Sequence, residues 1–565
     1  MAEHKLEWLY RGMFAAFLAA GCGDGDPEPS LRKAEQSGAR SEAVATGDAG
    51  RDAGGEAEGD AGRVRSAEAA IEPLSVPEAY FQEIDRQRVV KPVEVNAGQR
   101  RSVALVVVDA LNASHVSCYG YDRDTTPNID FLAREGLMLT NYVSNSSWTR
   151  PSFTTMVTGL PKSEHRIELN GRHLEPEIVT LAERFREAGY RTAAFVGNPL
   201  VRKAWGYSQG FEKYVDGGDL GKTFPPDSEL TDRAVRWLKR IDPDEPVFFL
   251  MFYTAPHTPY RPPAEPRRFL SQVPPGKIIA WPYREYQEPL PAEQHARIVA
   301  AYDDEVAYAD AELGRLMKKM AEHGRKDAVV AVTADHGEAF GIHNCYTHTY
   351  HMWEATLRVP AVIRSPDLPI HGEIDDRPFT HVDLAPTLLD LAGVDASREG
   401  LNGVSIVATL SDPKRGRDRT LFSQYNAHGI RREAIRSGRL KLVHHHEVSE
   451  AALSRLNSLH EGVPHADPHE LPSLATDGER YELYDLVSDP KEQKNIFERG
   501  GGDEDLASLL NELRERSGIE VTEMSRNLSE ETLEALEAAG YIRRAPEKDE
   551  AARGGEKKES REREE

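Results

Sequence analysis

The chain has 565 residues, of which 39% are hydrophobic, enough for a large buried core and for more than one small domain. Its 70 basic residues stand against 94 acidic ones, which gives a formal charge of −24 at pH 7. Non-specific binding to nucleic acid needs a positive field, so this charge balance argues against a nucleic-acid partner.

Residues 1–22 have the pattern of an export signal. Lys5 and Arg11 precede a short apolar stretch, residues 13–21, that ends at Cys22. The stretch is too short to span a bilayer as a mature helix. Its end, Leu-Ala-Ala-Gly-Cys, resembles a bacterial lipobox, so we expect a lipid on Cys22 that anchors the protein at the cell envelope, in the periplasm or at the cell surface. A signal for soluble secretion, cut nearby, is the alternative.

Both ends of the chain differ in composition from its middle. Residues 23–75 are Gly, Ala, Glu, Asp and Arg with almost no large apolar residue, so we expect a disordered tether there. Residues 545–565 predict a solvated, charged tail. Residues 96–425 then form the predicted catalytic domain, residues 426–500 a subdomain, and residues 501–544 a helical extension. Within this extension Ser529 begins a predicted helix and Gly540 ends it.

Three continuous apolar runs predict strands that are buried on both faces of a sheet. They are residues 102–108, 246–253 and 328–333. A helical pattern precedes the third run, with apolar residues at 3/4 spacing and Gly324 near its end. This alternation of strands and helices predicts an α/β fold with a largely parallel sheet.

Polar side chains with ligand chemistry follow each of these three runs. Asp109 ends the first, His257 lies just past the second, and Asp335 and His336 follow the third. Open α/β sheets place their sites at the carboxyl ends of their strands. We therefore expect these side chains to share one site.

Residues 148–159 predict a turn that leads into a short helix. Pro151 suits the first helical turn and Gly159 suits its end. Thr149 then lies at the helix N-terminus, where backbone N–H groups and the helix dipole favour a phosphate or sulfate. The alternative is that Thr149 only caps the helix.

The order of motifs along the chain resembles a known family. The motifs are Val-Asp109-Ala-Leu, Cys118-Tyr-Gly-Tyr121, Thr126-Pro-Asn-Ile-Asp130, Thr149-Arg-Pro-Ser152, Thr158-Gly159, Pro256-His257-Thr-Pro-Tyr260, Ala334-Asp-His-Gly-Glu338, His348, Trp353-Glu354, Leu357-Arg-Val-Pro360, Arg436-Ser-Gly-Arg-Leu-Lys441, Glu482-Leu-Tyr-Asp-Leu, Asp489-Pro and Asn495. From about residue 100 to 500 they resemble the sulfatase family of the alkaline phosphatase superfamily. The resemblance implies a large, mostly parallel sheet flanked by helices and a smaller C-terminal α+β subdomain.

The resemblance also implies a metal site. Asp109, Thr149, Asp335 and His336 would hold a divalent cation, and this mixed set of oxygen and imidazole ligands does not distinguish Ca²⁺, Mn²⁺, Zn²⁺ and Mg²⁺. One ion is expected and a second is open. His343 could complete a second position, or it is a buried, hydrogen-bonded histidine.

Further residues match positions that contact the substrate in relatives. His257 and His348 would touch the sulfate or phosphate or protonate the leaving oxygen. Arg150 and Lys162 could contact the anion, or they lie on the solvated surface. The triplet at residues 444–446, three histidines in a row, is interpreted as an incidental surface run rather than a ligand set.

The chain also departs from the family pattern. Thr149 stands where sulfatases carry the Cys or Ser that becomes formylglycine, and formylglycine cannot form from threonine. Phe153 replaces the arginine of the same motif, while Asn112 and Ser114 stand where relatives commonly have Arg and Asp. Threonine is, however, the nucleophile in phosphodiesterase and phosphotransferase branches of the superfamily.

These residues leave three hypotheses for the function. The first is a metal-dependent hydrolase of small-molecule, glycan or lipid sulfate or phosphate esters, with Thr149 as the nucleophile. The second is an enzyme that transfers a phospho-group to a lipid or glycan at the cell envelope. The third is a non-catalytic binding protein that kept the fold.

Overall fold

The structure is a computed structural model that describes residues 100–517, apart from 169–171, 265–266, 277, 279–288, 347, 349, 369, 395–399, 413, 428, 454–477 and 498–502. The predicted signal, the tether, the helix at 529–540 and the charged tail lie outside the described residues. In the described part of the chain, no helix combines the length and the apolar character needed to cross a membrane.

The larger sheet has eight strands in the order β5-β4-β6-β1-β7-β8-β2-β9. Their bounds are β1 (Val103–Val108), β2 (Leu137–Leu139), β4 (Arg191–Val196), β5 (Lys213–Val215), β6 (Val247–Tyr253), β7 (Val329–Thr333), β8 (Ala361–Arg364) and β9 (Glu373–Asp375). Only β8 runs antiparallel to its neighbours β7 and β2; the other pairings are parallel. The predicted α/β fold with a large, mostly parallel sheet is confirmed. The three apolar runs form β1, β6 and β7.

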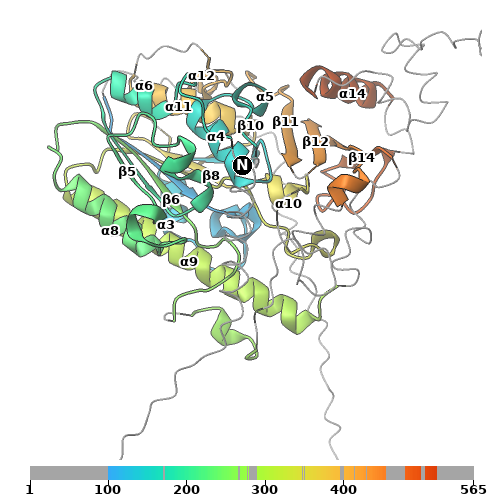
Figure 1. The fold of residues 1–565 in the computed structure, drawn as a ribbon, viewed down its shortest axis with the longest axis horizontal. Coiled ribbons are helices and arrows are strands. Elements are labelled where there is room, and N and C mark those ends of the chain that lie inside the picture. Colours follow the sequence, from blue (N-terminus) through green and yellow to red (C-terminus); the bar gives the residue numbers. More distant parts are fainter. Residues whose placement is uncertain are drawn as a thin grey trace, which may run out of the picture. The chain divides into compact units, whose positions relative to one another are not determined.

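Helices cover both faces of this sheet. The α-helices in the described part of the chain, on this sheet and beyond it, are α3 (Pro127–Arg134), α4 (Thr149–Thr158), α5 (Lys162–His165), α6 (Leu181–Glu187), α7 (Gly217–Leu220), α8 (Asp227–Leu238), α9 (Ala292–Glu322), α10 (Glu354–Leu357), α11 (Leu384–Leu391), α12 (Ile406–Leu410) and α14 (Asp503–Ser517). The long helix α9 lies beside α8 (Figure 1). Gly324 follows α9 with a φ of +78°, a left-handed conformation that glycine adopts without strain.

Strand β6 shows why its sequence is apolar at every position. Phe252 stacks on Phe153 of α4, with ring centroids 5.2 Å apart, whereas Phe249, an odd number of positions earlier, contacts Trp237 of α8. Successive side chains of a strand point to opposite faces, so α4 and α8 cover opposite sides of the sheet. The strand is therefore buried on both faces, as its continuous apolar run predicts.

A second sheet follows in the C-terminal part of the chain. Its strands β11 (Leu421–Ala427), β12 (Ile430–Ser437), β13 (Leu440–His445) and β14 (Arg480–Asp485) are antiparallel and neighbours in this order. Leucines of α14, including Leu506 and Leu513, pack in one buried cluster with Ile435 and Leu442 of the sheet. This is the predicted α+β subdomain, and its first strand begins at Leu421.

A buried network of charges joins the C-terminal sheet to the catalytic region. Glu354, the first residue of α10, accepts hydrogen bonds from Arg436 (2.7 Å) and Lys441 (3.1 Å), which lie on β12 and β13. Lys441 also pairs with Glu492 at 2.8 Å, and Glu492 accepts the backbone N–H of Glu354. Motifs that lie far apart in the sequence therefore meet in one ion cluster.

The interpretation of residues 444–446 as a surface run is wrong. His444 and His445 belong to β13 and are buried, and His446 follows directly with a partly buried side chain. All six residues of β13 are buried, so neither face of this strand is open to solvent.

Candidate active site

The proposed ligands come together at one edge of the large sheet. Asp109 directly follows β1, and Asp335 and His336 come two and three residues after Thr333, the last residue of β7. Asn198 follows β4, and His257 lies in the turn after β6. Four neighbouring parallel strands thus deliver polar side chains at their carboxyl ends.

Each of the two aspartates has one oxygen held by hydrogen bonds and one without a donor. Asp335 Oδ1 accepts the backbone N–H groups of Ala110 (3.1 Å) and His336 (2.9 Å), and Asp109 Oδ2 accepts the Asn198 amide at 2.6 Å. The other two oxygens, Asp109 Oδ1 and Asp335 Oδ2, are buried and have no hydrogen-bond partner. Since buried carboxylate oxygens are costly without a partner, this pair has the character of a cation site.

His336 presents its Nε2 atom to these two oxygens. Nε2 lies 3.6 Å from Asp109 Oδ1 and 3.4 Å from Asp335 Oδ2, and the Thr149 hydroxyl is 3.3 Å away. The other ring nitrogen, Nδ1, lies 3.1 Å from the Gly337 carbonyl oxygen, which only an Nδ1–H can donate to. Nε2 is then the nitrogen with a lone pair, the form that binds a metal.

The electrostatics of the free site agree with this chemistry. Burial, and then the charge of Asp335, raise the pKa of Asp109 well above its usual value. Burial lowers the pKa of His336 to about 3, so its imidazole is neutral at pH 7. Two carboxylates and a neutral imidazole within 4.8 Å of one another form an oxygen-rich, anionic donor set that fits a divalent cation.

His257 and His348 lie beside His336. The ring centroids of His348 and His336 are 4.2 Å apart, and those of His257 and His348 are 4.9 Å apart. Burial lowers the pKa of both His257 and His348 below the usual value of histidine. The structure therefore brings both predicted histidines next to the ligand group as neutral imidazoles.

The Glu338 carboxyl contacts the Nδ1 atom of His348. The His348 Nδ1 atom is 3.3 Å from each Glu338 carboxyl oxygen, and the Tyr260 hydroxyl donates to one of them at 3.1 Å. Burial raises the pKa of Glu338 to about 8, so the carboxyl keeps its proton at neutral pH. Glu338 thus fixes the ring of His348 without adding a negative charge.

Thr149 is the first residue of α4, and no side chain caps this helix end. Ser152, one turn on, donates to the Asp335 carbonyl oxygen at 2.5 Å and lies 3.0 Å from His381 Nδ1. This contact ties the start of α4 to the end of β7. The uncapped N–H groups of the first turn lie beside the ligand group and favour an anion there.

Arg150 and Lys162 are buried rather than solvated. The Arg150 guanidinium donates to the Arg172 carbonyl oxygen and lies over the Trp205 ring, 4.8 Å from its centroid. Lys162 pairs with Glu168 at 3.1 Å. Each cation thus contacts protein groups near α4.

His343 lies apart from the ligand group. Its ring stacks on Trp353, with centroids 4.4 Å apart, and its side chain is partly buried. Of the two groups of metal-binding side chains among the described residues, neither includes His343.

The family follows from comparison with known proteins. Residues 101–394, just over half of the chain, match the model of the family described as sulfatase. The chain belongs to the sulfatase family. Residues 341–477 also match a model described as N-sulphoglucosamine sulphohydrolase, C-terminal. Members of this family typically bind a divalent metal ion, and the group of Asp109, Asp335 and His336 is the candidate for it here.

Relatives within the sulfatase family are distant. The chain is 21% identical over 516 residues to an N-acetylglucosamine-6-O-sulfatase of Bacteroides thetaiotaomicron, covering 74% of this chain and 87% of that one. It is 24% identical over 367 residues to the uncharacterized sulfatase YidJ of Escherichia coli, covering 56% and 72%.

Solved structures show the same fold. One, a complex with its substrate D-glucosamine-2-N,6-O-disulfate, aligns with a TM-score of 0.58 at 20% identity and covers 74% of this chain and 98% of that one. The phosphonate monoester hydrolase of Agrobacterium radiobacter aligns with a TM-score of 0.57 at 21% identity and covers 74% and 95%. The predicted alkaline-phosphatase-like fold is confirmed.

Sequence reasoning missed two residues that hold the site together, Asn198 and Glu338. The position of Asn198 in the sequence could have indicated its role, because it follows the end of β4 at the same sheet edge as the predicted ligands. Glu338 stands in the quoted Asp335-His336 motif, but nothing local assigns it to His348, ten residues away.

The unusual residues of this chain have structural partners. Phe153 fills the core between α4 and β6, where it stacks on Phe252. Asn112 donates to the carbonyl oxygens of Glu338 and Ala355, and its side-chain oxygen accepts from Ser114. These replacements therefore keep the region around the site packed and hydrogen-bonded.

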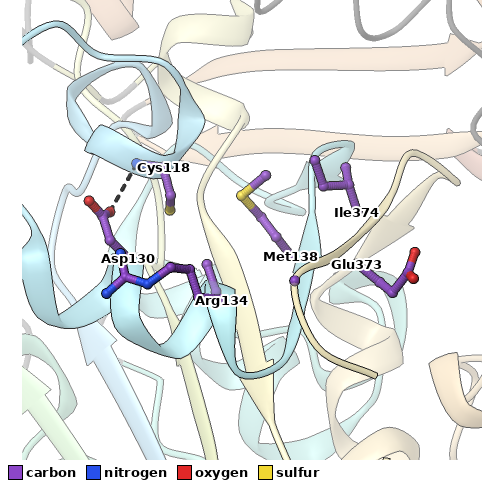
Figure 2. A pocket seen from close by; sticks show the side chains of 8 residues that line it. Cys118, Asp130, Arg134, Met138, Glu373 and Ile374 are labelled. Atoms are coloured by element: carbon purple, nitrogen blue, oxygen red, sulfur yellow. Dashed lines mark hydrogen bonds between the residues drawn. The ribbon is translucent and has the colours of Figure 1, made fainter. Parts of the chain in front are cut away.

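A cavity of about 260 Å³ lies elsewhere on the sheet, between α3, β2 and β9 (Figure 2). Cys118 and Asp130 line it, and the Cys118 N–H donates to Asp130 at 2.9 Å. Burial raises the pKa of the Cys118 thiol, so the reactive thiolate is disfavoured. None of the lining residues belongs to the ligand group, so this cavity is distinct from the candidate site.

Proposed function

We propose that the protein is a metal-dependent hydrolase of sulfate or phosphate esters in which Thr149 is the nucleophile. One observation carries this proposal. Two buried carboxylate oxygens that lack any donor converge on His336 Nε2, and the Thr149 hydroxyl lies 3.3 Å from that nitrogen at the uncapped start of α4. This position of the hydroxyl, beside a candidate cation site and a helix N-terminus, supports its role as the nucleophile.

Asp109, Asp335, His336 and Thr149 are the residues that would hold the metal. A divalent ion supplies Lewis-acid stabilisation of the ester oxygens and lowers the pKa of a coordinated hydroxyl. The surroundings prepare these side chains for metal binding. Asn198 and two backbone N–H groups orient the carboxylates, and the Gly337 carbonyl fixes the tautomer of His336.

Thr149 takes the place that formylglycine has in other sulfatases. Its oxygen forms a bond to the sulfur or phosphorus atom while the bond from that atom to the ester oxygen breaks. A neutral imidazole, His257 or His348, accepts the threonine proton and returns it to the leaving oxygen. Water then hydrolyses the ester on Thr149 and regenerates the hydroxyl.

The substrate class follows from the site and the relatives. Structures with this fold include an enzyme bound to a sulfated glucosamine and a phosphonate monoester hydrolase, so both tetrahedral anions suit the fold. The lipobox-like end of the signal at Cys22 would place the enzyme on the cell envelope, where glycan and lipid esters are available.

An activity panel tests the proposal. Purified protein is assayed on an aryl sulfate, a phosphate monoester and a phosphodiester, each with Mn²⁺, Zn²⁺, Mg²⁺ or Ca²⁺. Thr149→Ala should lower turnover of the preferred ester by at least about 10³-fold, as expected for removal of a nucleophile. Thr149→Ser keeps the hydroxyl and is the matched control, which should retain most activity.

The results also separate the other two hypotheses. If Thr149→Ala turns over as fast as the wild type, the covalent mechanism is wrong. Transfer to an added alcohol in excess of hydrolysis would indicate a transferase. Wild-type protein that binds no divalent ion at Asp335 and His336 would indicate a non-catalytic member of the family.

A further inference from the structure

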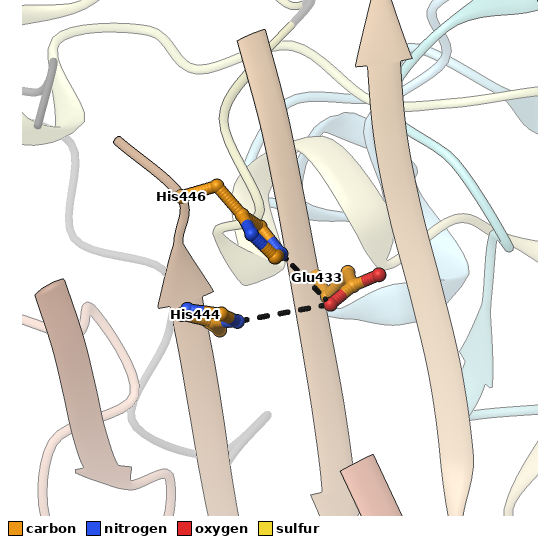
Figure 3. Close-up of side chains that lie close together, drawn as sticks. All are labelled: Glu433, His444 and His446. Carbon is orange, nitrogen blue, oxygen red and sulfur yellow. Dashed lines mark hydrogen bonds and ion pairs between the residues drawn. The ribbon is translucent and has the colours of Figure 1, made fainter. Parts of the chain in front are cut away.

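A second group of histidine and carboxylate side chains lies on the C-terminal sheet, outside the candidate active site. Glu433 lies on β12, His444 lies directly opposite it on β13, and His446 is two residues farther along (Figure 3). Side chains two residues apart in an extended chain point to the same face. The three therefore converge over one face of the sheet.

The contacts of Glu433 divide its two oxygens between different partners. Arg431 donates to Oε1 from Nη2 (2.8 Å) and Nε (3.2 Å). Oε2 lies 3.1 Å from His446 Nε2 and 3.7 Å from His444 Nδ1. One oxygen is thus fixed by a guanidinium, and the other faces two imidazole nitrogens.

His444 is completely buried, and its two ring nitrogens make ion-pair contacts to Glu433 and Glu479 but no hydrogen bond of good geometry. Its ring stacks on Tyr481, with centroids 4.3 Å apart and planes nearly parallel, so the ring is held in place. Buried imidazole nitrogens that face carboxylates without a well-formed hydrogen bond to them are costly unless something else binds them. This is the observation that points to a ligand.

Glu479, just before β14, faces the far side of both rings. His444 Nε2 lies 3.4 Å from Glu479 Oε2, and His446 Nδ1 lies 3.8 Å from Glu479 Oε1. Each histidine therefore directs one nitrogen toward Glu433 and the other toward Glu479. A carboxylate behind each ligating histidine is the common outer arrangement of metal sites, because it fixes the tautomer and orients the ring.

We infer that Glu433, His444 and His446 form a second metal site, with Glu479 as the residue that positions both histidines. Two imidazoles and one carboxylate are a donor set typical of Zn²⁺. Neighbouring ligand atoms in a tetrahedral zinc site lie about 3.3 Å apart, given the usual zinc–nitrogen distances. The measured separations of 3.1 and 3.7 Å fall on either side of this value.

The position of the site indicates what the ion would do. The three ligands join β12 to β13, and Glu479 adds the start of β14, so one ion would link three strands of the C-terminal sheet. The His446 side chain keeps 14% of its surface exposed, which leaves a route for the ion from solvent. This site is separate from the proposed catalytic centre, whose ligands follow β1 and β7 of the large sheet or begin α4.

Zinc titration of metal-depleted protein tests the inference, with Co²⁺ absorption as a second readout of imidazole ligands. The Asp335→Asn variant, in which the catalytic group is disabled, should still bind one equivalent of Zn²⁺. The double variant with His446→Gln should bind none. Glu479→Gln should weaken binding by about 10- to 100-fold, the usual effect of losing an outer carboxylate.

The same triplet supplies the matched control. His445 points to the other face of β13, where it pairs with Glu482 at 3.0 Å, so His445→Gln should keep the zinc equivalent. Circular dichroism checks that all variants fold. If Asp335→Asn protein binds no Zn²⁺, or if in this background His446→Gln binds Zn²⁺ as tightly as His445→Gln, the inference is wrong. Neither result bears on Thr149, whose test is esterase activity.

Discussion

The two histidine–carboxylate groups of this protein use similar side chains in different surroundings. Asp109, Asp335 and His336 lie at the ends of parallel strands and are completely buried, with two carboxylates for one imidazole. Glu433, His444 and His446 lie on the face of an antiparallel sheet, with one carboxylate for two imidazoles. The first set is rich in hard oxygen ligands and the second in nitrogen, so the two favour different ions.

The neighbours of each group explain its expected role. Next to the first group stand a hydroxyl, a helix N-terminus and two further imidazoles, which together can bind and attack an anion. Next to the second group stand Arg431, Tyr481 and Glu479, which hold the ligands in place. The comparison teaches that the ligands alone do not define a catalytic site; the groups around them do.

The largest expected effect comes from Asp335→Asn. The asparagine can still accept the two backbone N–H groups, but it removes the charge that faces His336. Turnover of the preferred ester should fall by at least about 10³-fold, because a Lewis acid contributes several kcal/mol and each 1.4 kcal/mol is tenfold. Steady-state kinetics measure this loss.

His446→Gln is the counterpart of that change in the other group. The kcat of the His446→Gln variant should stay within about twofold of the wild-type value, since Glu433, His444 and His446 take no part in the proposed reaction. Equal losses of turnover in both variants would show that the two groups are not separate in function.

Much of the fold and of the first group could be predicted from the sequence. The runs at residues 102–108, 246–253 and 328–333 are apolar throughout because parallel strands are covered on both faces, and each is followed by its polar residue. Gly159 ends α4 with a φ of +70°, which its predicted place at the helix end requires.

The remaining contacts depend on how distant segments pack. Glu338 reaches His348 only because the chain between them turns back, and Asn198 reaches Asp109 only because β4 and β1 flank β6. In the triplet at 444–446 the alternation of a strand is hidden, because every position is histidine. Only the pairing of β13 with β12 shows which two share a face with Glu433.

Glu354→Gln breaks the link between the two regions. Glu354 is buried between Arg436 and Lys441, so the variant leaves the buried Arg436 guanidinium without its anion, whereas Lys441 keeps Glu492. The free energy of unfolding should fall by about 3–5 kcal/mol, the usual cost of breaking a buried ion pair. Urea denaturation measures it. A loss below about 1 kcal/mol would show that the network does not couple the C-terminal sheet to the rest.

The same carboxylate predicts how stability depends on acid. Burial raises the pKa of Glu354, but Arg436 and Lys441 lower it more, to about 2 from the usual 4.5. Because the folded-state pKa is the lower one, this stabilisation is complete above pH 4.5 and is lost as the pH falls toward 2. It amounts to about 3 kcal/mol. Wild-type protein should lose stability over this range more steeply than Glu354→Gln, as urea titrations at several pH values would show; parallel curves would contradict it.

Chelation gives the smallest effect and compares the two groups directly. An ion that binds only the folded state adds about 2.7 kcal/mol at a free concentration 100 times its Kd. EDTA should therefore lower the Tm of the wild type by a few degrees, and His445→Gln should respond in the same way. Asp335→Asn and His446→Gln should each lose part of this response, and the double variant all of it, because each group binds its own ion. A full response in His446→Gln would mean that the wild-type shift comes from the catalytic group alone, and the buried nitrogens of His444 would then need another partner.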